Sequence, residues 1–199
     1  MSAEKLLQYW FGSCVEQPWE LPERRRIWFV GDSDFDDILR RDFAAAARAA
    51  AAGEYDGWRA EPRTALALLL LLDQLPRNLY RDDPRSYATD PAALALADSM
   101  LASGMERDLA PVEAAFIGMP FEHAENLEAQ DRAVAFFLGL CDRVTREPEE
   151  TLRGFVEFAR SHRDVIARFG RFPHRNRVLG RETTAAEESF MKARGRGFA

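Results

Sequence analysis

The chain has 199 residues, 47% of them apolar, which is enough to bury a large core, and nothing in it requires more than one domain across residues 1–199. The apolar run 65–72 is far shorter than the roughly 20 residues that cross a membrane. The amino end also lacks an apolar stretch with a cleavage site, so we expect a cytoplasmic protein without a membrane segment. The formal charge of −6 argues against nucleic acid as the main partner.

Apolar residues recur at spacings of three and four along nearly the whole chain, which predicts helices and no alternating strand. The clearest helix covers residues 34–52, because Ser33 followed by Asp36 suits its start and Gly53 suits its end. Asp90 before Pro91 is expected to cap another helix. In chain order, the predicted helices are 3–11, 22–30, 34–52, 62–75, 90–104, 111–117, 124–146, 149–169 and 185–193.

The connections between these segments are short and rich in Pro, Gly and Asp, so successive helices should pack as antiparallel hairpins. The predicted fold class is all-α, either a compact bundle or a short solenoid like that of tetratricopeptide (TPR) proteins. A repeat of about 34 residues is present only as a helix-pair rhythm, without the Trp, Gly, Tyr and Pro spacing of that array. Thr184 and Glu187 should form a capping box at the start of the last helix.

Neither metal nor redox chemistry is predicted. Cys14 and Cys141 are far apart in the sequence and lie on apolar faces, which favours reduced, buried thiols. The run GDSDFDD at 31–37 imitates the start of a calcium loop, but Asp37 stands where that loop needs Gly and Phe43 where it needs Glu. Because no HExxH or CxxC pattern occurs either, we expect no metal and no cofactor.

The first polar motif is LLDQLPRNLYR, residues 71–81. Asp73, Arg77 and Arg81 stand four apart and would share one helix face. Pro76 should kink or end the helix and free a carbonyl near Leu72, which a polar side chain of the same motif could satisfy. Two interpretations stay open: a buried polar joint between helices, or an arginine clamp for a carboxylate or phosphate.

The second motif is MPFEHAENLEAQ, residues 119–130. Pro120 is expected to break one helix before the next begins, which leaves Glu122, His123 and Glu125 at the junction. A histidine beside carboxylates favours its charged form and could carry a proton. The alternative is that the carboxylates only complement a helix start while the histidine caps the loop.

The third motif, HRDVIARFGRFPHRNRVLGRETTAAEE at 162–188, lies in the basic end of the chain: residues 160–199 carry ten basic side chains against four acidic ones. Gly170 should end the preceding helix, and the irregular segment 171–184, here called the strap, follows. Phe169 and Phe172 would anchor it to the core. Cations beside His174 oppose its protonation, so it could act as a neutral base. The strap could be pinned to the acidic body by salt bridges, could form an anion site, or, with the least support, could bind RNA.

Together these motifs resemble a bacterial family known as domain-of-unknown-function family nine-two-four. The resemblance rests on WF at 28–29 followed by FDD, on LDQLPRNLYR, on PFEHAENLEAQ and on RFGRFPHRNRVLGRETT, and it spans nearly the whole chain. It implies an all-helical fold similar to the tetratricopeptide superfamily and no established activity.

The leading hypothesis is one site at which the three motifs converge on a small anionic ligand, because polar groups that are costly to bury are concentrated in these motifs. His123 and His174 are the candidate catalytic acid or base. The candidate ligand-binding residues are Asp73, Arg77, Asn78, Arg81, Glu122, His162, Arg171, Arg175 and Asn176. The rival hypothesis is an interaction scaffold that presents a helical groove to a protein or peptide.

Overall fold

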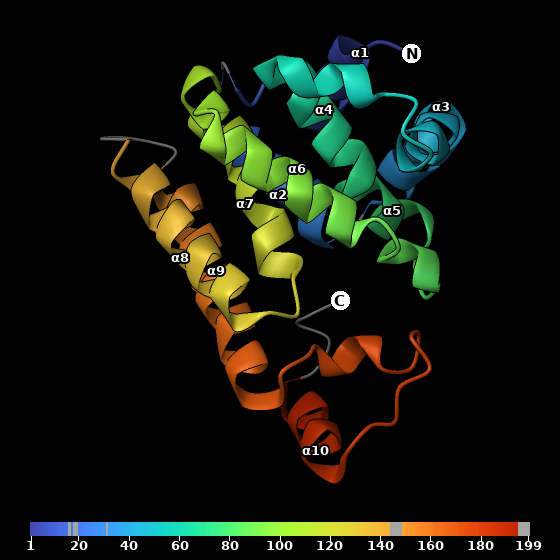
Figure 1. The fold of residues 1–199 in the computed structure, drawn as a ribbon, viewed down its shortest axis with the longest axis vertical. Coiled ribbons are helices and arrows are strands. Elements are labelled where there is room, and N and C mark those ends of the chain that lie inside the picture. Colours follow the sequence, from blue (N-terminus) through green and yellow to red (C-terminus); the bar gives the residue numbers. More distant parts are fainter. Residues whose placement is uncertain (16, 18–19, 31, 144–148, 195–199) are drawn as a thin grey trace.

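The computed structural model describes residues 1–15, 17, 20–30, 32–143 and 149–194, which form helices and turns without a strand among them (Figure 1). The predicted all-α class is confirmed. The α-helices are α1 (Ala3–Phe11), α2 (Leu21–Arg25), α3 (Ser33–Ala51), α4 (Pro62–Leu72), α5 (Gln74–Leu79), α6 (Asp90–Ala102), α7 (Pro111–His123), α8 (Leu127–Cys141), α9 (Glu149–Phe169) and α10 (Ala185–Arg194). A resemblance to tetratricopeptide solenoids stays a prediction.

Two central helices organise the packing. Helix α4 contacts α1, α3, α6 and α7, and α7 in turn packs against α6, α8 and α9. All residues from Ala65 to Leu72 of α4 are buried, because neighbours surround this helix on every side. Helices α8 and α9 lie side by side along one edge, and α10 with the strap lies at the end of the molecule away from α1 (Figure 1).

A second, small apolar cluster holds the strap. Val165 and Ile166 of α9 pack with Phe172, and Phe169 and Phe190 pack against them. Phe169 and Phe172 therefore anchor the strap as predicted, but to this cluster at the end of α9 and not to the main core. The cluster ties α9, the strap and α10 into one unit.

The helix predicted at 62–75 is in fact divided at Asp73 into α4 and α5. Pro76 lies in the first turn of α5, where its missing N–H needs no partner, while its ring would clash with the carbonyl four residues earlier, that of Leu72. The carbonyl of Leu72 is thus freed, as predicted. Its partner is the Thr89 hydroxyl at 2.5 Å, so the expectation of a partner within the motif was wrong.

Helix α7 continues through Pro120 to His123, whereas the sequence predicted a helix that stops at residue 117. An interior proline costs about 3 kcal/mol, but Phe121 beyond it is fully buried, and burial of such a side chain returns about 1.5–3 kcal/mol. The buried side chain of Gln130 also holds the helix end, because its Nε2 donates to the carbonyls of Glu122 at 2.6 Å and Ala124 at 2.8 Å. Glu122 and His123 consequently lie in the last turn of α7 and not at the start of the next helix.

Several helix ends differ from the predictions. Asp32, not Ser33, caps α3, with its carboxylate accepting from the N–H of Phe35 at 3.0 Å. The N-cap position of α6 is held by Thr89, which leaves the carboxylate of Asp90 for other contacts. The segment predicted as a helix at 22–30 is α2 followed by a π-helical turn, Arg26–Val30.

Of two further helices, α8 differs from its prediction and the start of α10 agrees with it. Helix α8 covers 127–141 where 124–146 was predicted, and residues 144–146 lie outside the described part. The capping box of α10 is confirmed: the N–H of Thr184 donates to Glu187 at 2.7 Å, and the N–H of Glu187 donates to the Thr184 hydroxyl at 3.3 Å.

Gly118 sets the close approach of α7 and α8. A Cβ at this position would lie 2.7 Å from ring atoms of Phe136 and of Phe137. We expect Gly118→Ala to lower the free energy of unfolding by about 1–3 kcal/mol through overpacking, measured by urea denaturation. Gly139→Ala on α8 is the matched control, because a Cβ there would meet no atom within 4 Å apart from its own helix backbone, and it should stabilise by up to about 1 kcal/mol. Equal effects of the two variants would contradict the close packing.

Candidate functional site

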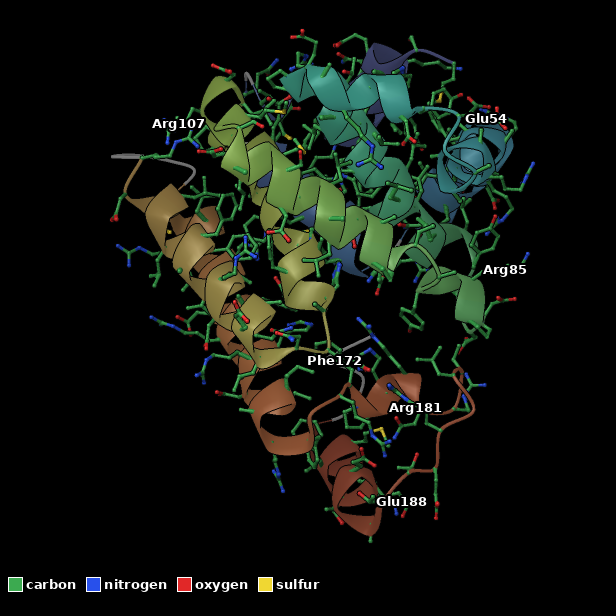
Figure 2. The ribbon with its side chains drawn as sticks, in the orientation of Figure 1. Glu54, Arg85, Arg107, Phe172, Arg181 and Glu188 are labelled. Carbon is green, nitrogen blue, oxygen red and sulfur yellow. The ribbon has the colours of Figure 1, made fainter. Side chains whose placement is uncertain are left out.

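The three polar motifs lie near one another in space. The first is at the junction of α4 and α5, the second at the carboxyl end of α7, and the third in the strap (Figure 1). Figure 2 shows Phe172 of the strap below the end of α7, with Arg181 further from that helix. Hydrogen bonds and ion pairs link all three motifs.

Asp73 is the buried centre of the first two motifs, with 1% of its surface exposed. Its Oδ1 accepts from Nδ1 of His123 at 2.7 Å, and its Oδ2 accepts from Gln74 at 2.6 Å. Burial raises the pKa of Asp73, but the charges of His123 and Arg77 and these hydrogen bonds outweigh it and lower that pKa to about 2. Because an ionised carboxylate only accepts, Nδ1 of His123 carries a proton, and the ring is held in a fixed orientation.

Asp90, at the start of α6, joins the first motif to the strap. Its two oxygens accept from Nη1 and Nη2 of Arg77 at 2.9 and 3.0 Å. Arg77 also donates to the backbone carbonyl of Asp73 at 2.7 Å. On the other side, Oδ2 of Asp90 accepts a longer hydrogen bond, 3.4 Å, from Nη1 of Arg175. No signal in the sequence pointed to this role of Asp90, which was expected to cap a helix.

Arg175 makes fewer hydrogen bonds than Arg77 or Arg181, the other two arginines that join the three motifs. Only 6% of its surface is exposed, and its Cζ lies over the rings of Tyr87 and Phe172, 4.6 Å from each centroid. Its Nε is buried and makes no hydrogen bond to a described residue. Burial and the nearby charge of Arg77 lower the pKa of Arg175, while Asp90 and Glu125 act in the opposite direction.

Glu125, in the loop between α7 and α8, attaches the strap to the second motif. It accepts two hydrogen bonds from Arg181, at 2.6 and 3.0 Å, and one from the N–H of Phe172 at 2.8 Å. Burial raises the pKa of Glu125, but these hydrogen bonds outweigh it and lower that pKa. Arg177 contacts Asp82 at the surface, so strap arginines contact carboxylates of the body at three places.

The two remaining histidines lie around Phe172. His162 of α9 contacts the buried carboxylate of Glu122 at 3.0 Å, and its ring meets that of Phe172 edge to face. His174 directly precedes Arg175 in the chain, and its ring centroid lies 5.6 Å from that of Phe172. Burial and the charge of Arg175 lower the pKa of His174 to about 3, so its ring is neutral at neutral pH, as the sequence analysis expected.

Four of the predicted site residues take part in local joints outside this cluster. Asn78 and Arg81 both donate to Asp36 of α3 at 2.8 Å. Arg171 binds Glu187 of α10 through two hydrogen bonds, at 2.7 and 3.0 Å, and Asn176 donates to the same carboxylate at 3.4 Å. The contacts of Asn78 and Arg81 fit a polar joint between helices, the alternative for the first motif, whereas those of Arg171 and Asn176 hold the strap to α10.

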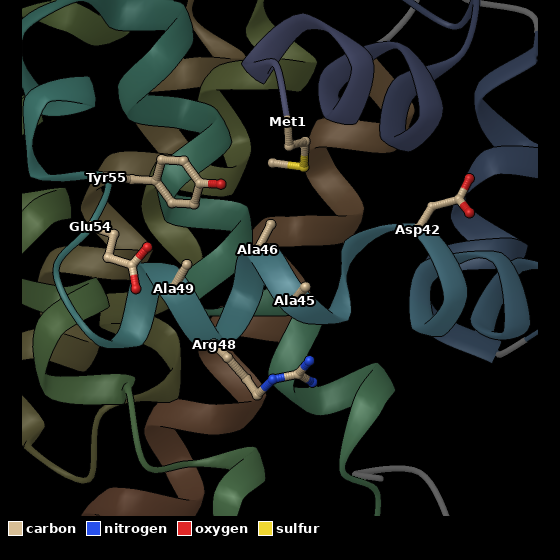
Figure 3. Close-up of a pocket in the computed structure, with 8 residues that line it drawn as sticks. All are labelled: Met1, Asp42, Ala45, Ala46, Arg48, Ala49, Glu54 and Tyr55. Atoms are coloured by element: carbon tan, nitrogen blue, oxygen red, sulfur yellow. The ribbon is translucent and has the colours of Figure 1, made fainter.

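A hollow of about 500 Å³ lies elsewhere on the molecule, between Met1, the carboxyl half of α3, and Glu54 with Tyr55 (Figure 3). Its walls include Ala45, Ala46 and Ala49, and no predicted site residue lines it. Small apolar side chains and a few separate charges give it no convergent polar groups. The hollow is therefore separate from the site formed by the three motifs.

Among the described residues, no group of three or more His, Cys, Asp and Glu side chains is placed to hold a metal ion. Cys14 is buried, as expected, whereas Cys141 is only half-buried. In the same part of the chain, no helix combines the length and apolar character needed to cross a bilayer.

The fold and this cluster define an all-helical protein in which arginines, histidines and carboxylates from distant segments form one buried network. The chain belongs to DUF924, a family described as bacterial proteins of unknown function, whose model matches residues 6–195. A solved structure of a protein of unknown function from Agrobacterium tumefaciens, ATU0120, is similar, with 35% identity, a TM-score of 0.80, and coverage of 96% of this chain and 97% of that one. The comparison with curated proteins gave no match.

Proposed function

We propose that this protein binds a small anionic ligand at Arg175, beside the Asp73–His123 pair. The single observation that carries the proposal is the state of Arg175: a buried guanidinium with one long hydrogen bond and an Nε that no described residue accepts from. An unsatisfied buried donor costs about 1–3 kcal/mol, and more where it is charged. An oxyanion bound there would satisfy it.

The neighbours of Arg175 give the site its other properties. Arg77 is held in place by Asp90, and it connects Arg175 to Asp73 and His123. With Nδ1 of His123 committed to Asp73, Nε2 is the nitrogen that could exchange a proton with a ligand. His123 is therefore the proposed proton carrier, and Asp73 is the residue that positions it.

The proposal is tested by measuring the melting temperature of the protein with a panel of carboxylates and phosphates at equal ionic strength. A ligand at 100 times its Kd stabilises the native state by about 2.7 kcal/mol, which corresponds to a rise of about 5–10 °C for a chain of this size. We expect at least one anion to raise the melting temperature of the wild type but not that of Arg175→Gln.

Arg177→Gln is the matched control, because Arg177 is also a strap arginine paired with an aspartate, but both partners are 75% exposed. This variant should respond to the anion as the wild type does. If no anion stabilises a normally folded wild type, or if both variants lose the response equally, the proposed site at Arg175 is wrong.

A further inference from the structure

We infer that the strap is a gate over Arg175, held shut by arginine–carboxylate contacts with the body of the protein and opened when these contacts break. The body here means the described residues of α1 to α8 and of the segments between them. The inference rests on the anion site proposed above and concerns the regulation of that site. It is supported by the seal over Arg175, by the contacts between strap and body, and by the separate apolar cluster that holds the strap.

The closed strap seals the group that an anion would meet. Nε of Arg175 has almost no surface exposed to solvent and donates to no described residue. Its guanidinium lies at the boundary between strap and body, with Cζ 4.6 Å from the ring centroids of Tyr87 in the body and of Phe172 in the strap. Because Arg175 belongs to the strap, separating the strap from Tyr87 uncovers the guanidinium.

The contacts across this boundary are mostly ionic. Figure 1 shows the strap, in orange, below the segment that joins α5 to α6. The N–H of Phe172 donates to Glu125 at 2.8 Å. Three arginines of the strap contact three carboxylates of the body: Arg175 with Asp90, Arg177 with Asp82, and Arg181 with Glu125.

Such a boundary opens at a lower cost than an apolar one, because water solvates the charges as they part. Arg177 and Asp82 are both 75% exposed, and pairs of this kind contribute little to stability. Opening also gives Nε of Arg175 a water molecule as hydrogen-bond partner, which offsets part of the cost. The remaining attraction between arginines and carboxylates weakens as salt screens it.

The strap keeps its other attachments when it leaves the body. Phe172 packs in the small cluster at the end of α9, which is separate from the main core. Arg171 and Asn176 both donate to Glu187 of α10. The gate can therefore open while the strap stays joined to α9 and α10.

Ionic strength should set how often the gate opens. Between about 0.1 M and about 1 M salt, the Debye length falls from about 10 Å to about 3 Å, which screens contacts at the partly exposed boundary. The open state should then be more populated, while the closed state remains the main one. Access of an anion to Arg175 would thus depend on the charges around the strap.

The experiment measures by NMR how fast the Nε–H of Arg175 exchanges with water, at one pH and in increasing sodium chloride. Nε of Arg25 in α2 is the internal control, because it is also buried without a hydrogen bond to a described residue, but it packs against Gly154 and Phe155 of α9. Between about 0.1 M and about 1 M salt, exchange at Arg175 should rise about fivefold or more, and exchange at Arg25 less than about twofold.

Glu125→Gln removes a charge from the boundary and keeps the size of the side chain. At low salt, this variant should exchange the Nε–H of Arg175 faster than the wild type, and its rate should depend less on salt. Asp131→Asn is the matched control, because Asp131 pairs with Arg163 between α8 and α9, away from the strap. Since the salt series uses the wild type, the test holds even if Glu125→Gln does not fold.

The outcomes separate the gate from the anion site. Exchange at Arg175 that does not respond to salt, or that slows because chloride is held under a closed strap, would overturn the gate. Equal acceleration at Arg25 would also overturn it, because opening would then involve the whole protein. If exchange responds as expected but no carboxylate or phosphate raises the melting temperature, the anion site is wrong and the strap still opens. If an anion stabilises the protein and exchange does not respond, the site stands without the gate.

Discussion

Asp73→Ala is expected to lower the free energy of unfolding by about 3–5 kcal/mol, because it removes a fully buried carboxylate that pairs with Arg77 and accepts hydrogen bonds from two other side chains. The carboxylate of Asp73 accepts from His123 and Gln74, and Nη1 of Arg77 lies 3.4 Å from it. Without it, the buried Gln74 and the half-buried His123 lose these hydrogen bonds. Urea denaturation at neutral pH measures the change, which corresponds to a fall in melting temperature of roughly 6–20 °C.

Asp98→Ala is the matched control, since Asp98 also pairs with an arginine on another helix, but the side chains of Asp98 and Arg132 are 45% and 46% exposed. Such surface pairs contribute about 0–1 kcal/mol, so this variant should remain close to the wild type. If Asp73→Ala is no more destabilising than Asp98→Ala, the buried network at Asp73 does not hold the α4–α5 junction to α7.

The Asp73 carboxylate also adds a pH dependence with a defined sign. Its pKa is about 2 in the native protein, below its ordinary value of 3.8, so the unfolded chain takes up a proton first as the pH falls. The stability that Asp73 contributes is therefore fully present above about pH 4 and is lost between about pH 4 and pH 2. The curve for Asp73→Ala should lack this loss.

Local spacing was enough to predict most helices, and it failed where a long-range contact decides the outcome. Helices α3 and α9 follow from apolar residues at intervals of three and four, because one face of each is buried and the other is not. In α7, by contrast, the spacing carries little information, since both faces are buried between neighbouring helices. The sequence around Pro120 predicts a break there, because nothing near it shows that Gln130 secures the turn beyond it.

The candidate site, too, can be predicted from the sequence only in part. The interval of four residues placed Asp73 and Arg77 on one face, and they are in contact at 3.4 Å. The role of Asp90 could not be predicted, because its pairing with Arg77 and Arg175 depends on how α6 packs beside the strap. By sequence alone Asn78 and Arg81 are equally suited to a ligand, but only the fold places Asp36 of α3 next to them.

His174→Gln is expected to flatten the pH dependence of stability between about pH 6 and pH 4. The pKa of His174 is lowered from 6.5 to about 3 in the native protein, by burial first and then by Arg175 and His162, with Arg181 adding to this and Glu125 opposing it. As the pH falls below about 6.5, the unfolded chain binds a proton at this residue and the native state does not. The wild type should therefore lose up to about 1.4 kcal/mol of stability per pH unit from this one group.

Urea denaturation at several pH values gives the measurement, and the quantity compared is the slope of the unfolding free energy against pH. The carboxylates whose pKa values are lowered to about 2, Asp73, Asp83 and Glu187, are present in both proteins, so their contributions cancel in the difference between wild type and His174→Gln. Arg177→Gln should leave the slope unchanged, because its side chain is exposed and is not among the charges that act on His174. Parallel curves for wild type and His174→Gln would mean that the native imidazole takes up its proton near the ordinary pKa. The strap would then be open to water around Arg175, and the buried state of that guanidinium, on which the anion site depends, would be wrong.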